Sequence, residues 1–130
     1  MSIKISDSEL AVMEILWREG RPMPFAEIRA ELEANTQWKK STIQTLVLRL
    51  RDKEAITAHQ KYVTLYTPNI SQEEYIQAQG QTFVDKLFGG SAKNLVAALC
   101  RSGQLAEEDI DELKAYFHVK GSHVKGRDAE

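Results

Sequence analysis

The chain has 130 residues, enough for one compact domain or a small domain with an appendage, and its formal charge of -2 excludes a uniformly basic nucleic-acid binder. Cys100 is the single cysteine, so an internal disulfide is excluded, and no apolar run is long enough to cross a bilayer. Because the first residues, MSIKISDSEL, lack the apolar core of a signal peptide, we expect a cytoplasmic protein without direct membrane insertion.

The N-terminal part of the chain predicts two short helices joined by a proline-containing link. Ser6 and Glu9 have the spacing of a capping box, in which each side chain bonds the other residue's backbone N–H at a helix start. Gly20 is suited to end this helix, and Pro24 suits the first turn of the next. The side chains expected to face inward are Leu10, Met13, Leu16, Trp17, Phe25, Ile28 and Leu32, with Trp38 packing just before a third helix.

Residues 38–53 predict this third helix, which has two different sides. Its apolar residues recur at the three- and four-residue spacing that lines one side of a helix, whereas the other side is small, polar and nearly free of carboxylates. Lys39 and Lys40 stand at its start, where the helix dipole disfavours cations unless a phosphate lies nearby. Three short helices with tight links predict a helix-turn-helix, with this one as the recognition helix. The apolar stripe consists of Ile43, Leu46, Val47 and Leu50.

The outward side of this helix supplies the residues expected to contact DNA. Gln44 is the best candidate for reading a base, since a side-chain amide can pair twice with adenine, and Leu48 can touch a thymine methyl. Basic side chains are the candidates for contacting phosphates, because such contacts are electrostatic and independent of the DNA sequence. For each position the alternative is an ordinary solvated side chain. The base-reading candidates are Ser41, Thr42, Gln44, Thr45 and Leu48, and the phosphate candidates are Lys39, Lys40, Arg49 and Lys61.

After Lys53 the apolar period changes from helical spacing to alternation. Ile56 and Ala58 alternate with polar neighbours, and Val63 and Leu65 alternate with Tyr62, Thr64 and Tyr66. This pattern predicts two strands joined by a turn at Gln60-Lys61, although the turn lacks the usual Asn-Gly or Asp-Gly pair. A helix-turn-helix followed by a hairpin is a winged helix, which we expect to close near Pro68. Residues 1–70 therefore predict a winged-helix DNA-binding domain.

The remainder of the chain predicts three more helices. Ser71 and Glu74 have the spacing of a second capping box, and Gly89-Gly90 should end the helix that it starts. Residues 71–117 are too few for an independent core, so their apolar faces predict a two-fold dimer, the alternative being packing back onto the winged helix. Gly80 indicates either close approach of another helix or a tolerated kink. The dimerisation candidates are Ile76, Gly80, Phe83, Leu87, Leu95, Leu99, Ile110, Leu113 and Phe117.

The charges of these two parts have opposite signs. The segment from Trp38 to Tyr62 contains six basic and two acidic residues. The segment from Ser71 to Phe117 contains four basic and eight acidic residues. A positive patch beside a negative module is what DNA binding by one half requires, and chance clustering of solvated charge is the alternative. Residues 118–130 are polar and glycine-spaced, which predicts a disordered tail.

An enzyme is not expected, because the histidines lie on the hairpin and in the tail without a partner at useful spacing. We identify no catalytic residue, metal-ligand set or cofactor motif. A winged helix that binds proteins rather than DNA is the main alternative function. The positive patch and the bare outward side of the third helix argue against it.

Taken together, these residues resemble the penicillinase repressor family, the BlaI/MecI/CopY group of bacterial winged-helix repressors. The likeness covers residues 5–117 and depends on an ordered set of short motifs, none of which is specific alone. They are Glu9, Val12-Met13, Leu16-Trp17, Ile28, Leu32, Trp38, Thr42-Ile43, Thr45-Leu46, Arg49-Leu50, Lys53, Tyr66-x-Pro68, Ser71-x-x-Glu74-Tyr75 and Gly89-Gly90-Ser91.

The resemblance implies a homodimer that binds a palindromic operator in double-stranded DNA and blocks transcription. Family targets include genes for β-lactam resistance, and a membrane-embedded sensor metalloprotease typically relieves repression by cutting the dimerisation module. The copper-responsive branch carries a C-terminal cysteine motif that this chain lacks.

Several positions depart from the family pattern. Lys39-Lys40-Ser41 stands where Ser-Pro-Lys is common, and Gln44 replaces a common Arg, so we expect a different operator sequence. Glu54 and Lys61 each occupy a position where Gly is usual. Ala98-Leu99 stands in place of the cleaved Asn-Phe bond, which puts proteolysis there in doubt.

Overall fold

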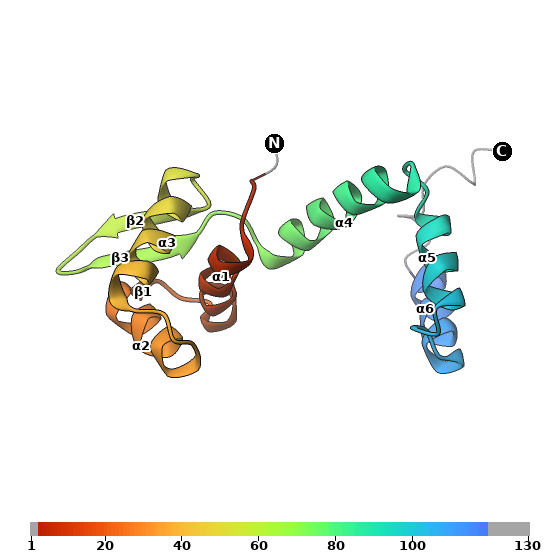
Figure 1. The fold of residues 1–130 in the computed structure, drawn as a ribbon, viewed down its shortest axis with the longest axis horizontal. Helices are drawn as coiled ribbons and strands as arrows, with labels where there is room; N and C mark the ends of the chain where they lie inside the picture. The colour runs from red at the N-terminus through yellow and green to blue at the C-terminus, as the bar shows by residue number, and fades with distance from the viewer. Residues whose placement is uncertain (1–2, 120–130) are drawn as a thin grey trace. The chain divides into compact units, whose positions relative to one another are not determined.

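The protein is mainly helical with one small sheet, as predicted (Figure 1). The computed structural model describes residues 3–119, and for 117–119 the backbone alone. The chain divides into two compact units, Met1–Gly80 and Gln81–Glu130, and the division falls within a helix. The elements are α1 (Asp7–Glu19), β1 (Met23–Pro24), α2 (Phe25–Asn35), α3 (Lys40–Asp52), β2 (Ile56–Gln60), β3 (Thr64–Pro68), α4 (Gln72–Phe88), α5 (Ala92–Arg101) and α6 (Glu107–Val119).

The core of the first unit lies among α1, α2, α3 and the sheet. The predicted apolar stripe of α3 is buried completely, and Ile43 and Leu50 have no exposed surface at all. Burial of each such side chain stabilises the fold by about 1.5 to 3 kcal/mol. Leu10, Trp17, Phe25 and Trp38 are partly buried and pack against this core, as expected. The buried cluster contains Val12, Met13, Ile15, Leu16, Met23, Ile28, Leu32, Ile43, Leu46, Val47, Leu50, Ala55 and Ile56.

Both ends of α1 are closed as the sequence predicted. The Glu9 N–H donates to Ser6 Oγ at 3.1 Å, and the Ser6 N–H donates to Glu9 Oε1 at 2.9 Å, completing the capping box. Gly20 ends the helix in the left-handed conformation with φ 65°. These contacts satisfy backbone groups that the helix itself leaves without partners.

The sheet contains one strand that the sequence pattern did not reveal. Its order is β1-β3-β2, and Met23 of the short strand β1 lies opposite Tyr66 of β3 in an antiparallel pair. Pro24 is both the last residue of β1 and the N-cap of α2, one position earlier than predicted. Two residues are too few to show alternation, so only pairing with β3 identifies β1 as a strand.

The hairpin turn also differs from the prediction. The last pair of the ladder joins Gln60 to Thr64, so residues 61–63 form the turn instead of Gln60-Lys61. The Lys61 N–H donates to the Val63 carbonyl at 3.1 Å across this turn. Val63 therefore lies in the turn and not in the strand. Of the β3 side chains, Tyr66 packs against the core.

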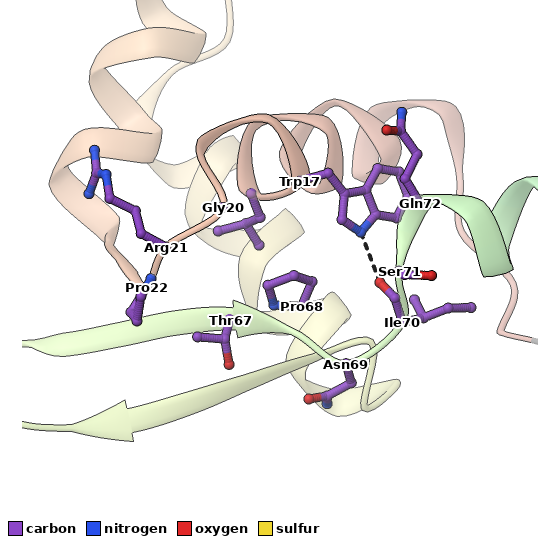
Figure 2. A pocket seen from close by; sticks show the side chains of 11 residues that line it. Trp17, Gly20, Arg21, Pro22, Thr67, Pro68, Asn69, Ile70, Ser71 and Gln72 are labelled. Carbon is purple, nitrogen blue, oxygen red and sulfur yellow. Dashed lines mark hydrogen bonds between the residues drawn. The ribbon is translucent and has the colours of Figure 1, made fainter.

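Trp17 connects α1 to the segment that leads into α4. Its indole Nε1–H donates to the Ile70 carbonyl at 2.8 Å (Figure 2). Its ring centroid lies 5.7 Å from that of Tyr75. A pocket of about 480 Å³ opens beside this contact and is lined by Gly20, Pro22 and Pro68 among others. Trp17 therefore holds the first turns of α4 against the winged helix.

The end of α3 adopts a Schellman motif at an unusual residue. The Ala55 N–H donates to the Leu50 carbonyl and the Glu54 N–H to the Arg51 carbonyl, both at 2.9 Å. Glu54 takes φ 65° and is the one non-glycine residue with positive φ among residues 3–119. The family resemblance led us to expect Gly at this position. Positive φ favours glycine because a Cβ is sterically strained there, and Glu54 has a Cβ.

A buried carboxylate joins α1 to the C-terminal end of α3. Glu9 is 2% exposed, and its Oε1 accepts from Lys53 Nζ at 2.5 Å. Lys53 Nζ also donates to the Lys4 carbonyl at 2.6 Å. Burial by itself raises the pKa of Glu9, but hydrogen bonds from Lys53 and Ser6 and the positive charge of Lys53 outweigh it and hold the pKa below its ordinary value.

The second unit consists of the end of α4 with α5 and α6. Ser71 and Glu74 form the predicted capping box at the start of α4, and Gly89 and Gly90, both with positive φ, follow its end as expected. Val84 is the one buried apolar side chain that the structure describes in this unit. Among residues 3–119 no helix is both long and apolar enough to span a membrane.

We expect Glu54→Gly to stabilise the protein by about 1 kcal/mol, because glycine adopts positive φ without steric strain. The measurement is the free energy of unfolding from urea denaturation. As a matched control, Asp52→Gly within α3 should destabilise by about 1 kcal/mol, since Gly costs helix stability. Equal effects of the two changes would contradict strain at Glu54.

We expect Glu9→Gln to destabilise the protein by about 1 to 2 kcal/mol through loss of the charged hydrogen bond to Lys53. Since folding lowers the pKa of Glu9, its stabilisation is complete above the ordinary value of 4.5 and is lost as the pH falls below it. The unfolding free energy of Glu9→Gln should therefore depend less on pH in that acidic range. Glu14→Gln, at an exposed position of α1, should retain the wild-type pH profile.

Candidate nucleic-acid interface

The outward side of α3 is a polar surface. All of the predicted base-reading residues are exposed, and Leu48, at 36%, is the most apolar of them. Thr45 Oγ1 donates to the Ser41 carbonyl at 2.9 Å, so its hydroxyl oxygen remains available as an acceptor. The buried stripe on the opposite side fixes which way this surface faces.

The start of α3 has the features of an anion site. Lys39 is the N-cap and provides no side-chain capping bond, and the first turn contains no acidic residue. The backbone N–H groups of this turn are therefore left to other partners, and Lys40 stands beside them. A helix start with free N–H groups and adjacent cations attracts a phosphate.

The cations near α3 fall into two groups. Arg51 pairs with Asp52 at 3.2 Å and Lys53 with Glu9 at 2.5 Å. Within residues 3–119, the remaining four basic side chains between Trp38 and Tyr62 have no acidic partner. These are Lys39, Lys40, Arg49 and Lys61, the residues predicted to contact phosphates.

The arginines elsewhere in the first unit are neutralised. Arg18 bonds Glu31 and Glu19, Arg21 bonds Glu27, and Arg29 bonds Glu33 at 2.8 Å. The hydrogen bond from Arg18 to Glu31, followed by that to Glu19, raises the pKa of Arg18. Positive charge without a partner is thus concentrated on α3 and the hairpin turn, where it can act on an external anion.

The hairpin turn adds exposed groups to this surface. Tyr62 is fully exposed and Val63 is 57% exposed, next to Lys61 (Figure 1 shows the hairpin that carries them). A groove of about 400 Å³ runs between α3 and this turn and is lined by Lys40, Gln44, Leu48 and Val63 among others. The sequence pattern did not indicate Val63, because the alternation of apolar residues predicted a strand there and no local signal records a groove shared by the turn and α3.

The predicted dimerisation residues present apolar surface in this single chain. Ile76, Phe83 and Leu87 are 59%, 46% and 58% exposed. Apart from its chain neighbours and the nearby backbone of α4, no described atom would lie within 4 Å of a Cβ on Gly80. Leu95, Leu99, Ile110 and Leu113 are half-buried, and the side chain of Phe117 lies outside the described residues.

The remaining predictions concern metals, the tail and cleavage. The described residues contain no cluster of metal-binding side chains, and His59 bonds Thr67 Oγ1 at 2.8 Å. The side chain of His118 and the tail beyond Val119 lie outside the described residues. Ala98 and Leu99 lie within α5, where their carbonyls accept backbone hydrogen bonds.

Most of the chain is similar to known proteins. The family model for the penicillinase repressor matches residues 5–118. The penicillinase repressor of Bacillus licheniformis is 35% identical over 111 residues, covering 85% of this chain and 86% of the relative. The methicillin resistance regulatory protein MecI of Staphylococcus aureus is 25% identical over 118 residues, covering 90% and 95%.

Two solved structures each match a little over half of this chain. The DNA-binding domain of the repressor BlaI matches with TM-score 0.51 and 39% identity, covering 56% of this chain and 89% of that one. The monomeric form of Bacillus licheniformis BlaI in complex with the blaP half-operator matches with the same TM-score and identity, covering 57% and 92%. The chain therefore belongs to the penicillinase repressor family, whose members are DNA-binding transcriptional repressors and not enzymes.

Proposed function

We propose that this protein is a homodimeric repressor that binds a palindromic operator through α3 and the β2–β3 hairpin and blocks transcription in the cytoplasm. The observation that carries the proposal is the group of four cations without acidic partners around a side of α3 with few carboxylates. The BlaI relative solved with a half-operator supports the same use of this fold. Promoter occupancy excludes polymerase and requires no catalytic group.

Each residue type has a distinct role in this proposal. Lys39, Lys40, Arg49 and Lys61 bind phosphates and position the protein, while Gln44 reads a base. Ser41, Thr42 and Thr45 contribute further hydroxyl contacts. Leu48 provides an apolar contact.

The dimer follows from the exposed apolar side chains of the C-terminal helices. Ile76, Phe83 and Leu87 lie on one side of α4, where a second copy would cover them. Two linked DNA-binding units then bind paired half-sites with a higher effective concentration than either alone. The dimerisation module of residues 71–117 remains part of this proposal.

The proposal that a membrane-embedded sensor metalloprotease relieves repression is based on the family resemblance alone. In this chain the Ala98–Leu99 peptide lies within α5. A protease binds its substrate in extended form, so cleavage there requires that α5 unwind first. The alternative function, a winged helix that binds proteins without DNA, leaves the four unpartnered cations without a role.

We expect Lys40→Ala to weaken binding to all duplexes alike and to reduce the salt-dependence slope of the dissociation constant by about 1, because one phosphate contact is lost. Fluorescence anisotropy across a salt series measures this slope. Arg29→Ala removes an exposed cation that Glu33 already neutralises, so its slope should equal that of the wild type. A base-specific loss in Lys40→Ala would contradict the assigned role.

We expect Gln44→Ala to relax preference at one operator position by about 1 to 3 kcal/mol, since a paired amide contact to adenine is removed. Selection from a random duplex library with both proteins identifies that position. An unchanged base preference would remove Gln44 from the reading residues, and failure of the wild type to select any duplex would overturn the proposed function.

We expect Leu87→Glu to convert the dimer to monomer, with association weakened by more than about 2 kcal/mol, because a charge replaces buried apolar surface. Sedimentation equilibrium gives the association constant. Gln81→Glu introduces the same charge on the opposite side of α4 and should leave the dimer intact. A wild-type monomer at micromolar concentration would refute the dimeric arrangement.

A further inference from the structure

The groove between α3 and the hairpin turn combines polar and apolar walls. Along α3 it is lined in order by Lys40, Gln44 and Leu48, which are four residues apart and therefore form one row on the helix surface. Val63 lies on the hairpin side, and Phe25 lines the groove from the start of α2. The tip of the hairpin and the recognition helix thus border one space of about 400 Å³.

Two apolar side chains in this groove are left in water. Leu48 is 36% exposed and Val63 is 57% exposed, whereas Val47, which also lines the groove, is buried and belongs to the core. Val63 takes no part in the strand ladder, and in the turn its carbonyl, not its side chain, accepts the Lys61 N–H. More than half of the Val63 surface is therefore open to solvent, where an apolar ligand group can cover it.

We propose that this groove receives the 5-methyl group of a thymine, held between Leu48 and Val63, so that the hairpin takes part in base reading together with α3. The inference rests on the proposed DNA binding. The thymine methyl is the one apolar group that the major groove presents, so apolar side chains on a DNA-reading surface have a single complement there. The sequence pattern alone did not predict that Val63 takes part in base reading.

The order of the row predicts where this thymine lies. Lys40 meets a phosphate, Gln44 pairs with an adenine, and Leu48 reaches the methyl group about 6 Å further along the helix. Base pairs are stacked about 3.4 Å apart. The thymine should therefore lie one or two base pairs from the adenine whose selection depends on Gln44.

The test replaces each thymine of the selected operator in turn by deoxyuridine, which lacks only the methyl group. With the full-length wild-type chain, one thymine position per half-site should lose about fourfold in affinity, the factor that corresponds to burial of one methyl group. In Val63→Thr, whose side chain has the same shape, the ratio of thymine to uracil affinity at that position should fall toward one. Tyr62→Thr changes the neighbouring exposed residue, which does not line the groove, and should retain the wild-type ratio.

The outcomes separate this inference from the proposed function. Tight, salt-dependent binding in which no deoxyuridine substitution lowers affinity would overturn the inference and leave the repressor function intact, with the groove then holding the sugar-phosphate backbone. A sensitive thymine whose ratio is unchanged by Val63→Thr would also overturn it, as would a selected operator with no thymine beside the adenine. If no duplex is bound at all, the proposed function fails instead.

Discussion

Burial of one side of α3 fixes the direction of the other side, and the proposed DNA surface depends on that constraint. Ile43 and Leu50 have no exposed area, so α3 cannot rotate about its axis without moving apolar surface into water. At its C-terminal end, Lys53 bonds the buried carboxylate of Glu9, and the Schellman motif ends the helix at Glu54. The polar side is thereby held outward before any ligand is present, and binding need not order it.

Charge is organised by the pairing of some cations and the isolation of others. The net charge of -2 conceals this, because the arginines on α1, on α2 and in the link between them are neutralised by glutamates, while the cations at the start of α3 and in the hairpin turn are not. An unpaired cation exerts its field on an external phosphate, whereas a paired one mainly joins two elements of the fold. The result is a surface suited to a polyanion on a protein that is acidic overall.

The two compact units differ in how much apolar surface they bury. The first has its own core, extended by Trp17, which donates to Ile70 and contacts Tyr75 at the start of α4. In the second, Val84 is the one buried apolar side chain that the structure describes, and several large apolar residues are exposed. Few buried contacts give little stabilisation to a unit alone, which is the physical basis for proposing that a second copy covers this surface.

The sequence by itself determined the features that depend on neighbouring residues. Helical spacing identified the two sides of α3, and the Ser6–Glu9 and Ser71–Glu74 capping boxes located two helix starts, because both signals lie within a few residues. Only the tertiary structure decided that Met23 pairs with β3, that Val63 borders a groove with Gln44, and that Lys53 meets Glu9. It also decided which four cations lack partners. Those features join residues far apart in the chain, 44 positions in the case of Lys53 and Glu9, and no local period records such a contact.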